Sequence, residues 1–81
     1  MNGLEKLAQK MRVTPKEVTH RLEILTQRER ELFAYRCGFD RGGEGRTLEE
    51  TAEAFNVTRE RVRQIETRAI ALIRHPKITT A

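Results

Sequence analysis

The chain has 81 residues, of which 37% are hydrophobic and 35% charged, with a formal net charge of +4. A chain of this length buries one modest core, which excludes a second domain with its own core. Cys37 is the only cysteine and serine is absent, so an internal disulfide and a multi-cysteine zinc site are excluded, and we expect neither an enzyme nor a metal or cofactor.

Two helices are predicted in residues 1–24. The first, over residues 4–11, rests on apolar residues at helical spacing, namely Leu4, Leu7, Ala8 and Met11. The second, over residues 15–24, begins with the cap Thr14, a proline at the first helical position, Pro15, and Glu17 three residues after the cap. Val18, Leu22 and Leu25 are its expected buried residues.

A third helix is predicted over residues 27–37. Thr26 and Glu29 form a capping box at its start, and Gly38 ends it. Residues 39–46 contain three glycines and several charges, which predicts a loop without regular structure.

The fourth and fifth helices, over residues 47–55 and 59–74, are predicted to form a helix-turn-helix. Thr47 and Glu50 make another capping box. Asn56 tolerates the left-handed backbone of a tight turn, and Ala52 leaves room for the next helix to cross closely. We expect Phe33, Phe55, Val62 and Ile65 to lie in one cluster.

The last of these helices has the pattern of a DNA-reading helix, although taken alone the pattern also fits an amphipathic helix with a solvated charged face. Thr58 caps it, and Val57 and Val62 supply the apolar pair of a hydrophobic staple. Its polar face begins with Arg59, Glu60 and Gln64, whose donors and acceptors suit base edges in the major groove. Residues 1–55 have ten basic and ten acidic side chains, whereas residues 56–81 have six and two, so the excess charge favours a polyanion at this helix.

The front of the chain repeats this pattern weakly. When Leu4 is set against Leu48, Ala8 matches Ala52, Thr14 matches Thr58 and Val18 matches Val62. Residues 1–24 therefore form an N-terminal helical segment with the spacing of a second helix-turn-helix. We interpret this repeat as packing geometry, because residues 15–20 offer little for reading bases.

From Leu25 to Pro76 the strings LTQRERELFAYRCGF and TLEETAEAFNVTRERVRQIETRAIALIRHP resemble conserved region four of the housekeeping bacterial sigma factors. This resemblance implies an all-α domain over residues 25–78 with a C-terminal helix-turn-helix. It implies a module of transcription initiation that reads the −35 promoter element and docks on the flap of the RNA polymerase β subunit.

The resemblance also assigns roles to residues. The base readers of the family match Arg59, Glu60 and Gln64. Its DNA-backbone contacts match Arg28, Arg36, Arg61, Arg63 and Arg68, to which we add the cap hydroxyls of Thr47 and Thr58 as phosphate contacts. The polymerase-binding residues are predicted to be Leu22, Leu25, Phe39 and Ile70, which cannot all be deeply buried in so small a fold. The alternative is that these four residues belong only to the core.

Three residues depart from the family pattern. Cys37 and Thr51 stand where larger apolar residues are usual, which thins the core, and Asn56 stands where glycine is common. The parts of a sigma factor that melt DNA need far more chain than this, so we do not expect a complete initiation factor.

Two other functions remain open. One is a free-standing helix-turn-helix transcriptional regulator, and the other is a protein-only adaptor or decoy on RNA polymerase. Activators and anti-sigma proteins are further candidate partners. No apolar run approaches the roughly 18 residues of a membrane span, and the single cysteine favours a reducing cytoplasm. The resemblance implies a bacterial protein associated with the nucleoid.

Overall fold

The computed structural model describes residues 1–75, and that part of the chain contains α-helices, two short 3-10 helices and no strand. In chain order the elements are α1 (Gly3–Met11), α2 (Pro15–Arg21), η1 (Leu22–Ile24), α3 (Gln27–Cys37), η2 (Phe39–Arg41), α4 (Leu48–Phe55) and α5 (Arg59–Arg74). The predicted all-α fold with a C-terminal helix-turn-helix is confirmed. The predicted domain end at residue 78 lies outside the described residues.

Side-chain caps start most of the helices where the sequence predicts them. Thr26 accepts the amide of Glu29 at 3.1 Å, and the Glu29 carboxylate accepts the amide of Thr26 at 2.9 Å. The same reciprocal pair forms between Thr47 and Glu50 at α4. A third capping box, Asn2 with Glu5, starts α1 one residue before the predicted position.

Two predicted boundaries are wrong in detail. The second helix does not remain α-helical to residue 24, because the chain tightens into η1 and the amide of Leu25 bonds to the carbonyl of Leu22 at 3.0 Å. This tighter turn leaves both leucines buried in the core. The segment 39–46, predicted to be irregular, begins with the 3-10 turn η2.

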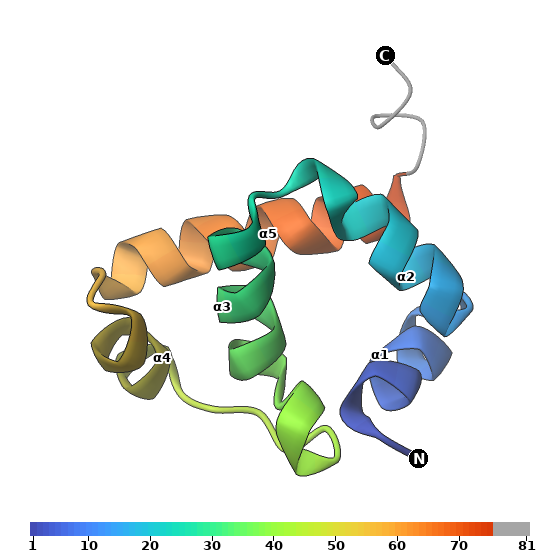
Figure 1. Cartoon of the computed structure of the whole chain (residues 1–81), viewed down its shortest axis with the longest axis horizontal. Helices are drawn as coiled ribbons and strands as arrows, with labels where there is room; N and C mark the ends of the chain where they lie inside the picture. The colour runs from blue at the N-terminus through green and yellow to red at the C-terminus, as the bar shows by residue number, and fades with distance from the viewer. Residues whose placement is uncertain (76–81) are drawn as a thin grey trace.

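The core consists of two clusters, and Figure 1 shows α3 between α4 on one side and α1 and α2 on the other. The first cluster joins residues of α1, α2, α3 and the end of α5: Ala8, Val18, Leu22, Leu25, Phe33, Ala69, Leu72 and Ile73. The second cluster joins α3, α4 and the start of α5: Leu32, Ala52, Val62 and Ile65. The expectation of one cluster is therefore wrong for Phe33, because Leu32 and Phe33 point about 100° apart on α3 and each reaches a different cluster.

The two helix-turn-helix units share one backbone geometry. Asn56 closes α4 in the left-handed conformation at φ 54° and ψ 49°, and Arg12 closes α1 at φ 60° and ψ 42°. After each turn a valine amide bonds back to an alanine carbonyl at 3.0 Å, Val57 to Ala52 and Val13 to Ala8. The repeat predicted from the sequence is thus present as packing geometry.

The N-terminal unit packs its second helix on the end of α5. Arg21 Nη1 donates to the carbonyl oxygen of Ile73 at 2.7 Å, and Val18 is fully buried in the first cluster. The guanidinium therefore satisfies a carbonyl at the C-terminal end of α5, where a positive charge is favourable. Across residues 1–75, no helix has the length and apolar character needed to cross a membrane.

Candidate nucleic-acid interface

Helix α5 has an exposed polar face in its first two turns. Thr58 Oγ1 accepts the amide of Arg61 at 3.0 Å and caps the helix. Val62 and Ile65 are buried in the second cluster, and this fixes the rotation of the helix about its axis. The three predicted base readers, Arg59, Glu60 and Gln64, are all exposed. The apolar contacts of α5 therefore set which side chains face outward.

Two of the predicted readers are held by exposed ion pairs. Arg59 Nη1 lies 3.1 Å from Glu49 Oε1, and both side chains are more than half exposed. Glu60 accepts two hydrogen bonds from Arg63, from Nη2 at 2.6 Å and from Nε at 3.1 Å. Exposed pairs of this kind contribute little stability, so these side chains can exchange their partners for base edges at low cost.

The charge state of Glu60 follows from its partner. The hydrogen bonds from Arg63 hold the pKa of Glu60 below its ordinary value and raise the pKa of Arg63. Glu60 is therefore an ionised acceptor at neutral pH. An ionised glutamate can accept a hydrogen bond from the amino group of cytosine and repels phosphate, which suits a side chain that reads bases.

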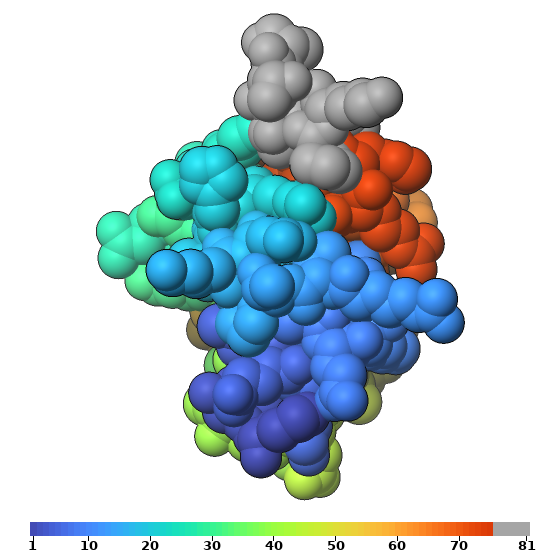
Figure 2. Space-filling view, turned by 90° about the vertical axis from the view of Figure 1, so that its right-hand side faces the viewer, coloured from blue at the N-terminus to red at the C-terminus, as the bar shows by residue number. Residues whose placement is uncertain are grey.

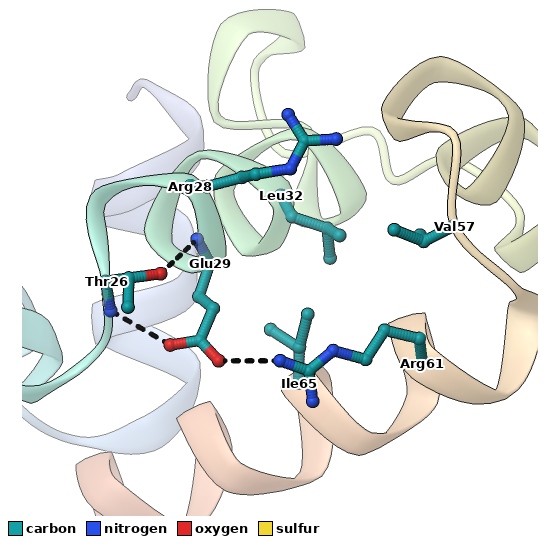
Figure 3. A pocket seen from close by; sticks show the side chains of 7 residues that line it. All are labelled: Thr26, Arg28, Glu29, Leu32, Val57, Arg61 and Ile65. Carbon is teal, nitrogen blue, oxygen red and sulfur yellow. Dashed lines mark hydrogen bonds and ion pairs between the residues drawn. The ribbon is translucent and has the colours of Figure 1, made fainter.

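A pocket between α3 and α5 gathers charged groups beside the helix-turn-helix (Figure 3). Its lining residues are Thr26, Arg28, Glu29, Leu32, Val57, Arg61 and Ile65. Glu29 Oε2 accepts a hydrogen bond from Arg61 Nη2 at 3.0 Å and lies 3.9 Å from Arg68 Nη1. The Glu29 side chain is only 12% exposed, whereas those two arginines are about half exposed. One nearly buried carboxylate thus orients two of the predicted phosphate-binding arginines.

Arg28 also contacts the last residue of α4. Its guanidinium lies over the Phe55 ring, 5.5 Å from the ring centroid, and Nη2 donates to the carbonyl oxygen of Phe55. Phe55 in turn packs edge-on against Tyr35. Arg28 is exposed but joins α3 to the end of α4, so it has a structural contact besides any contact with DNA.

The Arg36 side chain is largely buried between α3 and α5. Its Nε lies 3.1 Å from Glu66 Oε2, and each of these side chains is 25% exposed. Nη1 of Arg36 also donates to the carbonyl oxygen of Arg46. Arg36 therefore links α3 to α5 and to the chain that enters α4.

The cap hydroxyls of Thr47 and Thr58 are both exposed at helix starts. Each hydroxyl oxygen accepts an amide of its own helix, from Glu50 at 3.0 Å and from Arg61 at 3.0 Å. Each hydroxyl keeps its proton for donation to an outside acceptor. This arrangement leaves both threonines compatible with a phosphate contact.

Residues that position the arginines were missed by the sequence analysis. The sequence has no local signal for contacts between different helices. Such contacts bring Glu49 to Arg59, Glu66 to Arg36 and Glu29 to Arg61. Arg46 is a similar case: its guanidinium lies 3.8 Å from the centroid of the Tyr35 ring and pairs with both carboxylate oxygens of Asp40. These contacts order the segment that precedes α4.

The four predicted polymerase-binding residues do not form one exposed patch. Leu22 and Leu25 are 5% and 2% exposed and belong to the first cluster, so they contribute to the core and not to an open surface. Phe39 and Ile70 are only partly buried against that cluster. As expected, the four residues are not all deeply buried, because Phe39 and Ile70 keep part of their surface exposed. Within residues 1–75, no group of three acidic, histidine or cysteine side chains is placed to bind a metal.

Comparison with known proteins gives a consistent answer. The family described as "Sigma-70, region 4" matches residues 21–75. A protein named RNA polymerase sigma factor SigA from Clostridium acetobutylicum is 53% identical over 55 residues, which cover 68% of this chain and 14% of that protein. SigA proteins from Synechocystis sp. and Bacillus sp. are 51% identical over the same length, covering 68% of this chain and 13% and 14% of theirs. No solved structure matches the chain.

Proposed function

The chain belongs to the sigma-70 region 4 family, and on this basis we propose that it is a DNA-binding module of transcription initiation that reads the −35 promoter element with α5. The observation that carries the proposal is the outward face of that helix. Arg59, Glu60 and Gln64 stand in its first two turns and are exposed, and the partners of Arg59 and Glu60 are themselves exposed. These three side chain types match guanine, cytosine and adenine edges respectively.

Phosphate contacts would set the register of α5 in the groove. Arg61 and Arg68 lie on one flank of α5, where Glu29 holds them, and Thr47 and Thr58 lie at the starts of α4 and α5. Contacts of this kind position a protein without reading sequence. Arg63 would release Glu60 to reach a phosphate, whereas Arg28 and Arg36 would reach DNA from positions that also support the fold.

We further propose that the module docks on the flap of the RNA polymerase β subunit in the bacterial cytoplasm, at the nucleoid, and has no catalytic activity of its own. Phe39 and Ile70 are the partly exposed apolar residues that support this surface. Activators and anti-sigma proteins are further candidate partners of the same module. Because the chain spans 14% of the SigA protein from Clostridium acetobutylicum, it would supply recognition and not the full activity of an initiation factor.

Two linked experiments test this function. Selection of duplex DNA from a pool with a randomised hexamer should enrich one hexamer with the wild-type chain, and Arg59→Ala should lose the preference at one base pair. Core RNA polymerase should then co-purify with the chain both with and without that duplex. Selection of no preferred hexamer would contradict the reading function, and binding of DNA without polymerase would leave a free-standing regulator.

A further inference from the structure

Helix α1 covers an apolar side of the part of the chain that belongs to the family. The matching part begins at residue 21, so α1 lies entirely outside it. Ala8 of α1 is buried in the first cluster, and Leu4, Leu7 and Met11 pack against that cluster, as do Phe39 and Ile70 of the matching part. Figure 2 shows α1 and α2 forming most of this face of the molecule.

The first turn of α1 sits directly on η2. A Cβ atom placed on Gly3 would lie 2.6 Å from both the carbonyl oxygen of Gly38 and the Cα atom of Phe39. Atoms cannot approach this closely, so only glycine allows the helix to rest on that backbone. On the next turn Lys6 and Leu7 line a cavity together with Cys37. Helix α1 therefore occupies the surface next to Phe39.

Helix α1 is held to the rest of the fold by apolar contacts, whereas α2 also has a side-chain hydrogen bond to α5. Helix α1 has nine residues, a length at which an isolated helix is marginal in water. Among its apolar side chains only Ala8 is fully buried, and within residues 1–75 no ion pair joins α1 to another element. Helix α2 has Val18 in the core and the Arg21 bond to Ile73. Among the described residues, release of α1 would therefore break apolar contacts and no ion pair with another element.

We propose that α1 is an internal occupant of a helix-binding surface, and that an amphipathic helix of RNA polymerase displaces it. The inference rests on the proposed docking to polymerase. The apolar residues of α1 stand at positions i, i+3, i+4 and i+7, which is the spacing of a helix bound in an apolar groove. A partner helix with that spacing competes with α1, and its apparent affinity equals its intrinsic affinity multiplied by the fraction of chains in which the surface is open.

A single substitution tests whether α1 competes with the polymerase helix or only packs on the fold. Gly3→Val forces the first turn of α1 away from η2, and the variant should bind core RNA polymerase roughly fivefold or more tightly than the wild type, because more of its surface is open. Its DNA affinity should not change, since the reading end of α5 packs in the second cluster. The control Gln9→Ala alters an exposed position of α1 and should match the wild type in both assays.

Hydrogen exchange on the wild-type chain gives the second readout, which does not depend on how the variant folds. Addition of core polymerase should speed exchange at the amides of residues 6–11 while α4 and the start of α5 keep their protection. Unchanged or stronger protection of α1 in the complex, or equal polymerase affinity of folded Gly3→Val and wild type, would overturn the inference. Absence of polymerase binding by both chains would instead overturn the proposed docking, and the inference with it.

Discussion

Glu29 accepts a hydrogen bond from Arg61 at 3.0 Å, and this contact ties the first turn of α3 to the outward side of α5. The amide of Thr26 is the largest cause that lowers the pKa of Glu29 below its ordinary value of 4.5, with smaller contributions from the Thr26 hydroxyl, Arg68 and Arg61. A carboxyl whose pKa is lower in the folded state stabilises the fold above its unfolded pKa. That contribution is lost as the pH falls through the folded value.

The first prediction follows from this sign. Glu29→Gln should lower the free energy of unfolding at pH 7 by about 1–2 kcal/mol, because charge-assisted hydrogen bonds are lost. Below pH 4.5 the difference should shrink as the wild-type carboxyl takes up its proton. Urea unfolding from pH 7 to pH 3 measures both effects. Glu53→Gln, at an exposed position of α4, is the control, and a Glu29 variant that runs parallel to wild type at every pH would refute the assignment.

Alanine substitutions at Arg28 and Arg68 should differ in their effect on stability. Arg28 stacks on Phe55 and donates to its carbonyl oxygen, so Arg28→Ala should lower the free energy of unfolding by about 1–2 kcal/mol as well as weaken DNA binding. Arg68, which is 54% exposed, should lose DNA affinity with little change in stability. Thermal unfolding and DNA titration of the two variants measure this, and equal stabilities would show that the Phe55 contact contributes nothing.

The two clusters predict unequal costs for two phenylalanines. Phe33 is fully buried in the first cluster, so Phe33→Ala should cost about 3–5 kcal/mol. Phe55 packs against the second cluster but is only partly buried, so Phe55→Ala should cost less, about 2 kcal/mol, since less apolar surface is lost. Chemical unfolding of both variants decides the matter. A larger loss of free energy of unfolding for Phe55→Ala than for Phe33→Ala would contradict this ranking of the two positions.

Arg12 adopts the left-handed conformation, and replacing it with glycine should relieve backbone strain. A side chain other than glycine or asparagine costs about 1–2 kcal/mol in this conformation, and glycine loses part of that gain through its greater freedom in the unfolded chain. Arg12→Gly should therefore stabilise the protein by about 0.5–1 kcal/mol and raise the Tm by a few degrees. Asn56→Gly is the matched control and should gain less, because asparagine tolerates the left-handed region. Equal gains at both positions would contradict this explanation.

Local signals made most of the fold predictable. Thr26 with Glu29 and Thr47 with Glu50 marked helix starts to within a residue, and Asn56 marked the helix-to-helix turn, because caps and turns depend on a few neighbouring residues. The repeat between residues 4–18 and 48–62 was visible for the same reason. Figure 1 shows the arrangement that these signals could not give, with α3 between the two helix-turn-helix units.

Contacts between distant helices were not predictable. The separation of Phe33 from Phe55 depends on the side on which each helix crosses α3, and the sequence does not state this. The carboxylates that hold Arg36, Arg59 and Arg61 are ten or more residues away along the chain, with no spacing rule to reveal them. Composition could indicate a positively charged face, but the structure was needed to show which arginines are free to reach outward.

The most direct test of the account is a titration of Glu60→Gln against duplexes in which the preferred hexamer is changed one base pair at a time. The account predicts that discrimination falls by about 1–3 kcal/mol at one base pair only. Non-specific affinity should stay the same or rise, because the substitution removes a negative charge that would repel phosphate. Arg68→Ala in the same titration should weaken every duplex alike. If Glu60→Gln weakened all duplexes equally and kept the wild-type base preference, α5 would not be the reading helix.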